Sequence, residues 1–203
     1  MRMVLPRSFY ARPTLAVLED LIGKVLVHEV RGRKVSGVIV EAEAYIGEDD
    51  PACHAAPGPT TRNAPLYGPP GHAYVYFNYG MHYLVNAVTE DEGSPAAVLI
   101  RALEPRDGQD LMRRRRARVS GRPPGSFGAT DLCRGPGNLR AALAINLAQN
   151  RVDLTSSRLT IEDAGVRPAR LAWSPRVGIR VGVEKKWRCS WAGHPSVSGP
   201  RQR

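Results

Sequence analysis

The sequence lacks the features that would place the chain in a membrane or among secreted proteins. No apolar run reaches about eighteen residues, the length that a membrane-spanning helix needs, and residues 1–7 contain no apolar stretch of signal-peptide length. Cysteine occurs only at positions 53, 133 and 189, an odd number without close pairs. This spacing supports neither a disulfide framework nor a structural zinc site. We therefore expect a cytoplasmic protein that has no membrane partner, no metal and no cofactor.

Lysine is also scarce, since only four of the 29 basic residues are lysines. Basic residues outnumber the 19 acidic ones, and the formal net charge of +10 favours a polyanionic partner. Nucleic acid is the first candidate, and an anionic membrane surface is the second. The run Arg113-Arg-Arg-Arg-Ala-Arg118 lies in an expected helix over residues 107–119. It suits either a phosphate rail or an ordinary solvated helix face, and the sequence leaves both interpretations open.

The pattern of apolar residues predicts one α+β domain over residues 1–203, with a curved antiparallel β-sheet flanked by helices. A chain of this length can bury a single well-formed core. Residues 196–203 are polar and cationic, and we expect them to form a flexible tail. The expected helices and strands are residues 13–22, 25–30, 35–45, 72–86 as a hairpin, 96–103, 107–119, 139–145, 159–163, 177–183 and 187–191.

Residues 35–45 alternate with the period of a β-strand. The alternation places Val38, Val40, Ala42 and Ala44 on one face of that strand. The opposite face would then carry two carboxylates and a tyrosine. An aromatic ring next to a carboxylate lowers the local dielectric, which suits a general base.

The next segment, residues 47–71, is too long and too rich in Gly and Pro for a simple connection, so we expect a functional loop. It carries His54 and Arg62. Residues 72–86 then predict two aromatic strands joined by a turn near residues 78–80. Tyr79 stands at the tip of this hairpin beside Gly80, where a ring that projects from the sheet needs a partner to contact.

Several motifs, in order along the chain, resemble those of the alkyladenine (3-methyladenine) DNA glycosylase family, in its bacterial type. They are Glu41-Ala-Glu-Ala-Tyr45, Asp50-Pro-Ala-Cys-His54, Thr61-Arg-Asn63, Tyr74-Val-Tyr76, Tyr79-Gly-Met-His82, Leu99-Ile-Arg-Ala-Leu-Glu-Pro105, Gly135-Pro-Gly-Asn-Leu139 and Arg176-Val-Gly-Ile179. The resemblance covers nearly the whole chain. The family's C-terminal Pro-Trp-Arg-Phe pattern is not kept, because Trp187-Arg-Cys-Ser-Trp191 stands there.

The resemblance implies an enzyme that excises alkylated or deaminated purines from double-stranded DNA without a cofactor. We expect it to act as a monomer and to leave the strand intact, because none of the four lysines, the candidate nucleophiles, lies within residues 35–86. Glu43 matches the glutamate that activates the attacking water. By the same resemblance, Arg101 helps to hold the water and Glu43, and Val177 contributes a backbone carbonyl.

The resemblance also implies how the damaged base is held after it flips out of the duplex. Tyr45 and His54 would lie against one face of the base, and Tyr76 against the other. Asn86 matches the residue that excludes the exocyclic amino group of guanine. Tyr79 would enter the gap that the flipped nucleotide leaves.

The residues themselves leave other interpretations open. Glu41 and Glu43 could be a surface pair, and the aromatic rings could simply fill a core. A noncatalytic module that stacks its rings on bases would show the same aromatic and Arg residues. A carbohydrate hydrolase could use the two glutamates, but the positive charge and the tyrosine at the hairpin tip favour DNA.

Overall fold

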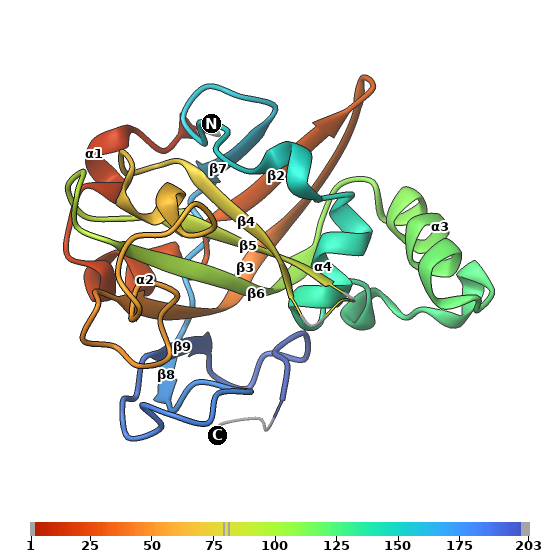
Figure 1. Ribbon diagram of the computed structural model, residues 1–203. Helices are drawn as coiled ribbons and strands as arrows, with labels where there is room; N and C mark the ends of the chain where they lie inside the picture. Colours follow the sequence, from red (N-terminus) through yellow and green to blue (C-terminus); the bar gives the residue numbers. More distant parts are fainter. Residues whose placement is uncertain (1–2, 79, 81, 200–203) are drawn as a thin grey trace.

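The computed structural model describes residues 3–78, 80 and 82–199 (Figure 1). Its strands pair antiparallel in one curved sheet with the order β1-β7-β2-β3-β6-β5-β4, while β9 pairs with β3 and β8 with β9. This confirms the expected α+β class. The strands are β1 Met3–Val4, β2 Val25–Val30, β3 Arg33–Ile46, β4 Ala73–Asn78, β5 His82–Val88, β6 Ala96–Pro105, β7 Leu159–Asp163, β8 Leu171–Ser174 and β9 Arg188–Trp191.

Four α-helices cover the sheet in the part of the chain that the structure describes: α1 Arg7–Tyr10, α2 Thr14–Leu21, α3 Gln109–Ser120 and α4 Pro136–Leu143. Helix α2 packs on β3 and β6, α4 packs on β5 and β6, and α3 packs on α4 at the edge of the molecule (Figure 1). Short 3-10 helices lie in the loops, at Ala64–Tyr67, Pro124–Ser126, Ala129–Asp131 and Leu147–Gln149. The connection of α3 to the sheet through α4 leaves much of α3 facing solvent.

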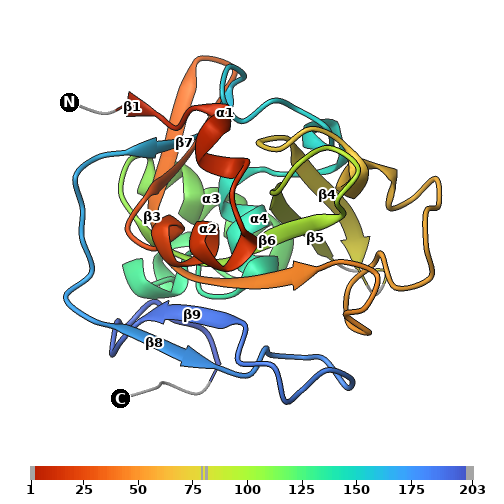
Figure 2. The same cartoon turned by 90° about the vertical axis from the view of Figure 1, so that its left-hand side faces the viewer.

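Strand β3 is the strand that positions the site. Its first half pairs with β2, its residues 41–43 pair with β9, and its other edge pairs with β6 over most of its length. In two perpendicular views, β8, β9 and the C-terminal segment lie together below the main sheet (Figures 1 and 2). The middle of β3 is therefore enclosed by segments that are far apart in the sequence.

Some expected elements differ from the observed ones. The turn between β2 and β3 is shorter than residues 31–34, because Arg31 and Gly32 both adopt positive φ angles, of 52° and 70°, as a two-residue hairpin turn requires. Residues 177–183 form no strand. These residues form a loop beside the site, although their apolar side chains predicted a strand.

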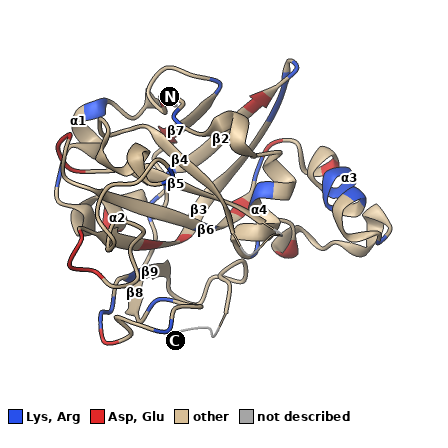
Figure 3. Cartoon of the chain, viewed as in Figure 1, with Lys and Arg blue, Asp and Glu red and all other residues tan. Residues whose placement is uncertain are grey.

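The run of arginines in α3 is in part structural. Arg113 donates to the carbonyl of Phe127, Arg115 to that of Ala142, and Arg116 to those of Asp131 and Leu132. Figure 3 shows that Lys and Arg also occur on the β2–β3 turn and on other parts of the chain. The positive charge is thus not confined to this helix.

Gly37 on β3 gives a test of the packing between β3 and β6. A Cβ atom at this position would lie 2.8 Å from Leu103 Cβ and 2.9 Å from the carbonyl oxygen of Glu104. We expect Gly37→Ala to destabilise the fold by about 1–3 kcal/mol, as overpacking of a core does. Gly125→Ala is the control, because nothing lies within 4 Å of its Cβ position. Thermal melting should separate the two variants, and equal melting temperatures would contradict the packing described here.

Candidate active site

The ladder between β3 and β6 is irregular around Glu41. The register shifts once between Ile39 and Glu41 and again between Glu41 and Ala42, so that Arg101 has no direct partner across the ladder. Such bulges redirect side chains and are frequent next to active sites. Here the irregularity lies where an arginine of β6 meets the glutamates of β3.

The same irregularity corrects the expected alternation along β3. Ala42 and Ala44 belong to the main hydrophobic core. Val38 and Val40 pack in a separate cluster with Val25 and Val27 of β2. The four small residues therefore do not share one face, because the bulge changes the phase of the strand between Val40 and Ala42.

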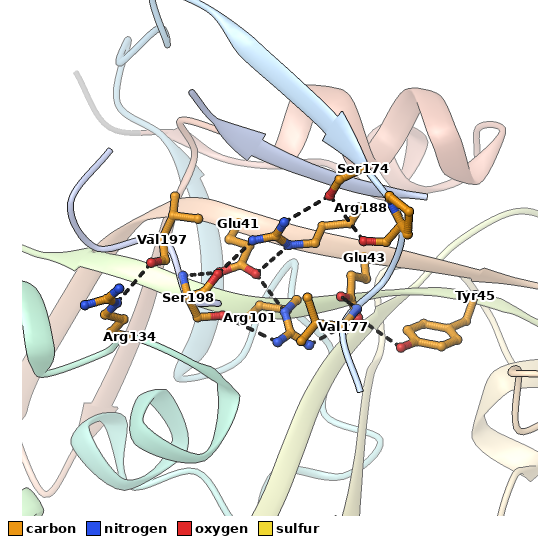
Figure 4. Close-up of polar contacts among 11 residues, drawn as sticks. Glu41, Glu43, Tyr45, Arg101, Arg134, Ser174, Val177, Arg188, Val197 and Ser198 are labelled. Carbon is orange, nitrogen blue, oxygen red and sulfur yellow. Dashed lines mark hydrogen bonds and ion pairs between the residues drawn. The ribbon is translucent and has the colours of Figure 1, made fainter. Parts of the chain in front are cut away.

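Glu43 is fully buried and is held by three donors (Figure 4). Its Oε1 atom accepts from the backbone N–H of Val177 at 2.7 Å, and its Oε2 atom accepts from the hydroxyl of Tyr45 at 2.9 Å and from Arg101 Nη1 at 3.2 Å. Burial raises the pKa of Glu43 above its ordinary value, and the donors oppose only part of that effect. The structure thus brings together three residues that the sequence places far apart, Glu43, Arg101 and Val177.

The pKa of Glu41 shifts in the opposite direction to that of Glu43, although Glu41 is also fully buried. Its Oε1 atom accepts from Arg101 Nε and from Arg188 Nε, each at 2.8 Å, and its Oε2 atom accepts from the backbone N–H of Ser198 at 2.6 Å. Burial alone would raise the pKa of Glu41, but Arg101 and Arg188 outweigh it, and the pKa is lowered. The two arginines therefore favour the charged form of Glu41.

The segment that contacts Glu41 differs from the flexible tail expected over residues 196–203. Ser196, Val197 and Ser198 are buried. Arg134 Nε donates to the carbonyl of Val197 at 3.0 Å, and Arg188 Nη2 donates to that of Ser198 at 2.7 Å (Figure 4). At least these three residues belong to the wall of the site, while residues 200–203 lie outside the described residues.

Two adjoining cavities open beside Glu43. The larger has a volume of about 320 Å³ and is lined by all three donors of Glu43 as well as by residues of β4, β5 and α4. The smaller has a volume of about 30 Å³ and is also lined by Cys53, Leu66, Tyr74, Asn86 and Ala97. Both are lined by Tyr45, Ala52, His54 and Tyr76. The residues predicted to bind a base thus surround one hollow, with the glutamate directly behind its wall.

The aromatic rings are arranged differently from the expectation. The ring centres of His54 and Tyr76 lie only 4.3 Å apart, edge to face. A flat base stacked between two rings needs about 7 Å between them, twice the contact distance of carbon atoms. His54 and Tyr76 therefore leave no room for a base between them and line the hollow side by side.

The polar atoms around this wall are held in place. His54 Nδ1 lies 2.8 Å from the hydroxyl of Tyr74, and Asn86 Nδ2 donates to the carbonyl of Tyr74 at 2.9 Å. Burial, and then the charge of Arg62, lower the pKa of His54, so the ring is neutral near pH 7. Tyr79, the predicted intercalating residue, lies outside the described residues.

Sequence reasoning missed four residues that support the site: Asp50, Arg176, Arg188 and Ser198. Asp50 and Arg176 form a buried ion pair next to Tyr45. Signals for two of them were present, because Asp50 begins the motif that ends at His54 and Arg176 precedes Val177. Arg188 and Ser198 gave no local signal, since their partner Glu41 lies 147 and 157 residues away.

Comparison with known proteins gives a consistent result. The sequence profile of methylpurine-DNA glycosylase (MPG) matches residues 8–195. The chain belongs to the methylpurine-DNA glycosylase family. A relative from Burkholderia lata, provisionally named a 3-methyladenine DNA glycosylase, is 46% identical over 98% of this chain and 93% of its own length. Relatives with the same provisional name from Methanocella arvoryzae and Chlorobaculum tepidum are 45% and 43% identical, over 96% and 94% of this chain and 96% and 88% of their own lengths.

Family membership makes this chain a DNA glycosylase, a hydrolase of base excision repair that acts on DNA. Within the described residues, no helix of this glycosylase is long and apolar enough to cross a membrane. Over the same residues, His, Cys, Asp and Glu side chains form no group of three or more that could hold a metal ion.

The contrast between the two glutamates predicts different effects on stability. We expect Glu41→Gln to cost about 3–5 kcal/mol, because it leaves two buried guanidinium groups without their shared anion. Glu43→Gln should cost much less, since the raised pKa of Glu43 shows that the site tolerates a neutral group there. Urea unfolding of both variants measures this difference. A larger loss for Glu43→Gln would reverse the roles assigned to the two residues.

Proposed function

We propose that this glycosylase excises alkylated or deaminated purines, the 3-methyladenine, hypoxanthine and ethenoadenine class, from double-stranded DNA as a monomer. The observation that carries the proposal is the position of Glu43. This buried carboxylate with a raised pKa lies behind a hollow of aromatic rings, and all three of its donors line that hollow. A general base works best when its pKa approaches the working pH, and aromatic walls suit a flat, flipped purine.

The hollow would take the base between Tyr45 and the joint wall of His54 and Tyr76. The ring faces carry negative potential and therefore attract electron-poor or cationic alkylated purines. Asn86 lines the smaller cavity, and its amide Nδ2 donates to the carbonyl of Tyr74. An amide held in this way cannot turn away from an exocyclic amino group at purine N2, which supports selection against guanine by exclusion.

The reaction that fits this geometry is hydrolysis of the N-glycosidic bond. Glu43 takes a proton from water, the water oxygen bonds to C1′ of the sugar, and the base leaves with the electron pair of the broken bond. Arg101 lines the larger hollow and contacts Glu43, so it can hold the water next to the carboxylate. Val177 already binds Glu43 through its N–H and would orient the water through its carbonyl. Because the carboxylate is the active form, the rate should fall as the pH falls through the raised pKa of Glu43.

The duplex would be opened by Tyr79. Strand β4 ends at Asn78 and β5 begins at His82, and both of these residues line the larger cavity. A ring placed in the vacated space offsets part of the stacking energy that flipping costs, which is a few kcal/mol. The buried and hydrogen-bonded glutamates favour this enzymatic role. A noncatalytic module that binds nucleobases would have no need of a buried carboxylate.

The central test is Glu43→Gln, which keeps the size of the side chain but cannot accept a proton. We expect single-turnover excision to fall by at least the roughly 100-fold typical of lost general-base catalysis, while binding to lesion-containing duplex persists. The assay uses duplexes with each lesion, developed with hot alkali. Near-normal excision by Glu43→Gln would remove Glu43 from the catalytic role.

A second test concerns the mechanism after base release. Lys24 is paired with Asp163, and Lys185 lies 3.9 Å from Asp50 and over the ring of Trp187. None of the four lysines lines either cavity beside Glu43, so we expect base release without strand cleavage. Treatment with borohydride during turnover should trap no protein–DNA adduct. An adduct that disappears in Lys185→Met would instead assign a lyase step to that residue.

A further inference from the structure

A buried ion pair outside the reacting groups adjoins several parts of the site. The side chains of Arg176 and Asp50 are both 0% exposed. Arg176 Nη2 donates to Asp50 Oδ1 at 2.8 Å, and Nη1 contacts the other carboxylate oxygen. Nη1 also donates to the carbonyl of Ala44 on β3 at 3.0 Å. A two-point contact of this kind fixes the plane of the guanidinium as well as its position.

The fixed guanidinium forms the back wall of the stacking ring. Its Cζ atom lies 4.7 Å from the centre of the Tyr45 ring and 5.3 Å from that of Trp187. A ring with a cation on one face leaves only its other face for a base. The tip of the same ring is tied to Glu43 through its hydroxyl. Tyr45 is thus held at its face by Arg176 and at its tip by the catalytic glutamate.

The partner carboxylate anchors the base-binding segment. The carbonyl of Asp50 accepts from Cys53 N at 2.8 Å, and its Oδ1 atom accepts from Ala52 N at 3.3 Å. These bonds shape the turn that leads to His54. Since both Ala52 and His54 line the hollow, displacement of Asp50 would change the part of the wall that these two residues form.

Arg176 is also connected to the catalytic glutamate through the backbone of the next residue. Arg176 precedes Val177, whose N–H donates to Glu43 at 2.7 Å and lowers the pKa of that carboxyl. Residues 177–183 form no strand that could hold this N–H in a ladder. The side chain of Arg176, anchored on Asp50 and Ala44, therefore supplies the restraint that a strand would otherwise give.

We propose that Arg176 is the positioning residue of this site. Its ion pair with Asp50 holds three elements in one geometry: the stacking ring, the segment that carries His54, and the backbone N–H that serves the catalytic base. Arg176 lines neither cavity and acts only through these neighbours. The inference rests on the proposed excision of a stacked base.

The first test is Arg176→Lys, which keeps the positive charge but cannot make the two-point contact. We expect the pKa of Glu43, followed by carbon-13 NMR of its carboxyl group in the protein without DNA, to rise by about one unit, because the charged form loses a hydrogen bond. Excision at saturating duplex should fall at least tenfold, since Tyr45 loses its back wall.

Arg116→Lys is the matched control. Arg116 is also buried, donates to the carbonyl of Leu132 at 2.9 Å and lies 5.0 Å from the ring centre of Phe127. The control should lower the melting temperature but leave the titration of Glu43 unchanged. A shift that follows Arg176→Lys alone is therefore specific to the site and not a result of general destabilisation.

Asp50→Asn separates positioning from simple electrostatics by the sign of its effect. Loss of a nearby negative charge would by itself lower the pKa of Glu43. Loss of positioning raises it, because the N–H of Val177 moves away from the carboxylate. Asp and Asn side chains have a similar shape, so we expect Asp50→Asn to fold. If Arg176→Lys does not fold, Asp50→Asn alone tests the proposal.

Two results distinguish this proposal from the function on which it rests. An unchanged or lowered pKa of Glu43 in both variants, with excision equal to wild type, overturns the role of Arg176. Wild-type protein that excises none of the lesions overturns the proposed substrates. The NMR titration still decides in that case whether Arg176 positions the glutamate.

Discussion

Two carboxylates with no solvent exposure need cations and hydrogen-bond donors to replace the water that each has lost. Arg101 donates hydrogen bonds to both glutamates, from Nε to Glu41 and from Nη1 to Glu43. Glu41 also accepts from Arg188 and from the backbone N–H of Ser198. The sheet, the β8–β9 pair and the C-terminal segment meet around these charges, so their arrangement depends on this one network.

The two carboxylates lie two residues apart on one strand, and their surroundings separate their roles. Two guanidinium groups hold Glu41 as an anion, whereas Glu43 shares a single guanidinium and relies on neutral donors. Pairs of titratable groups whose environments push their pKa values apart are typical of acid–base sites. Glu41 therefore keeps Arg101 in place, and Glu43 remains able to take up a proton.

The sequence predicted the parts of the molecule that depend on local patterns. Strand β7 was predicted at its observed bounds, and α2 and β6 within one or two residues, because apolar periodicity defines them. The bulge at Glu41 could not be predicted, since it arises from the register of β6 against β3. The contact between His54 and Tyr76 was equally hidden, because it depends on how a long loop folds against β4.

The site also resists prediction because its members are distant in sequence. Resemblance pointed to Glu43, Arg101 and Val177, and the structure brings them together. Arg188 stands in a segment that departs from the family pattern, and only its contact with Glu41 shows its importance.

The bond between Ser198 and Glu41 sets an order for assembly of the molecule. These residues lie 157 positions apart, so the bond closes a loop that spans most of the chain. Contacts of such long range form late in folding and late in synthesis on the ribosome. Strands β2 to β6 can pair before this segment arrives, but the arginines around Glu41 are not fully held until it docks. Nascent chains would thus carry a partly formed sheet and an unfinished reaction centre, which would delay the chemistry until this segment has been made.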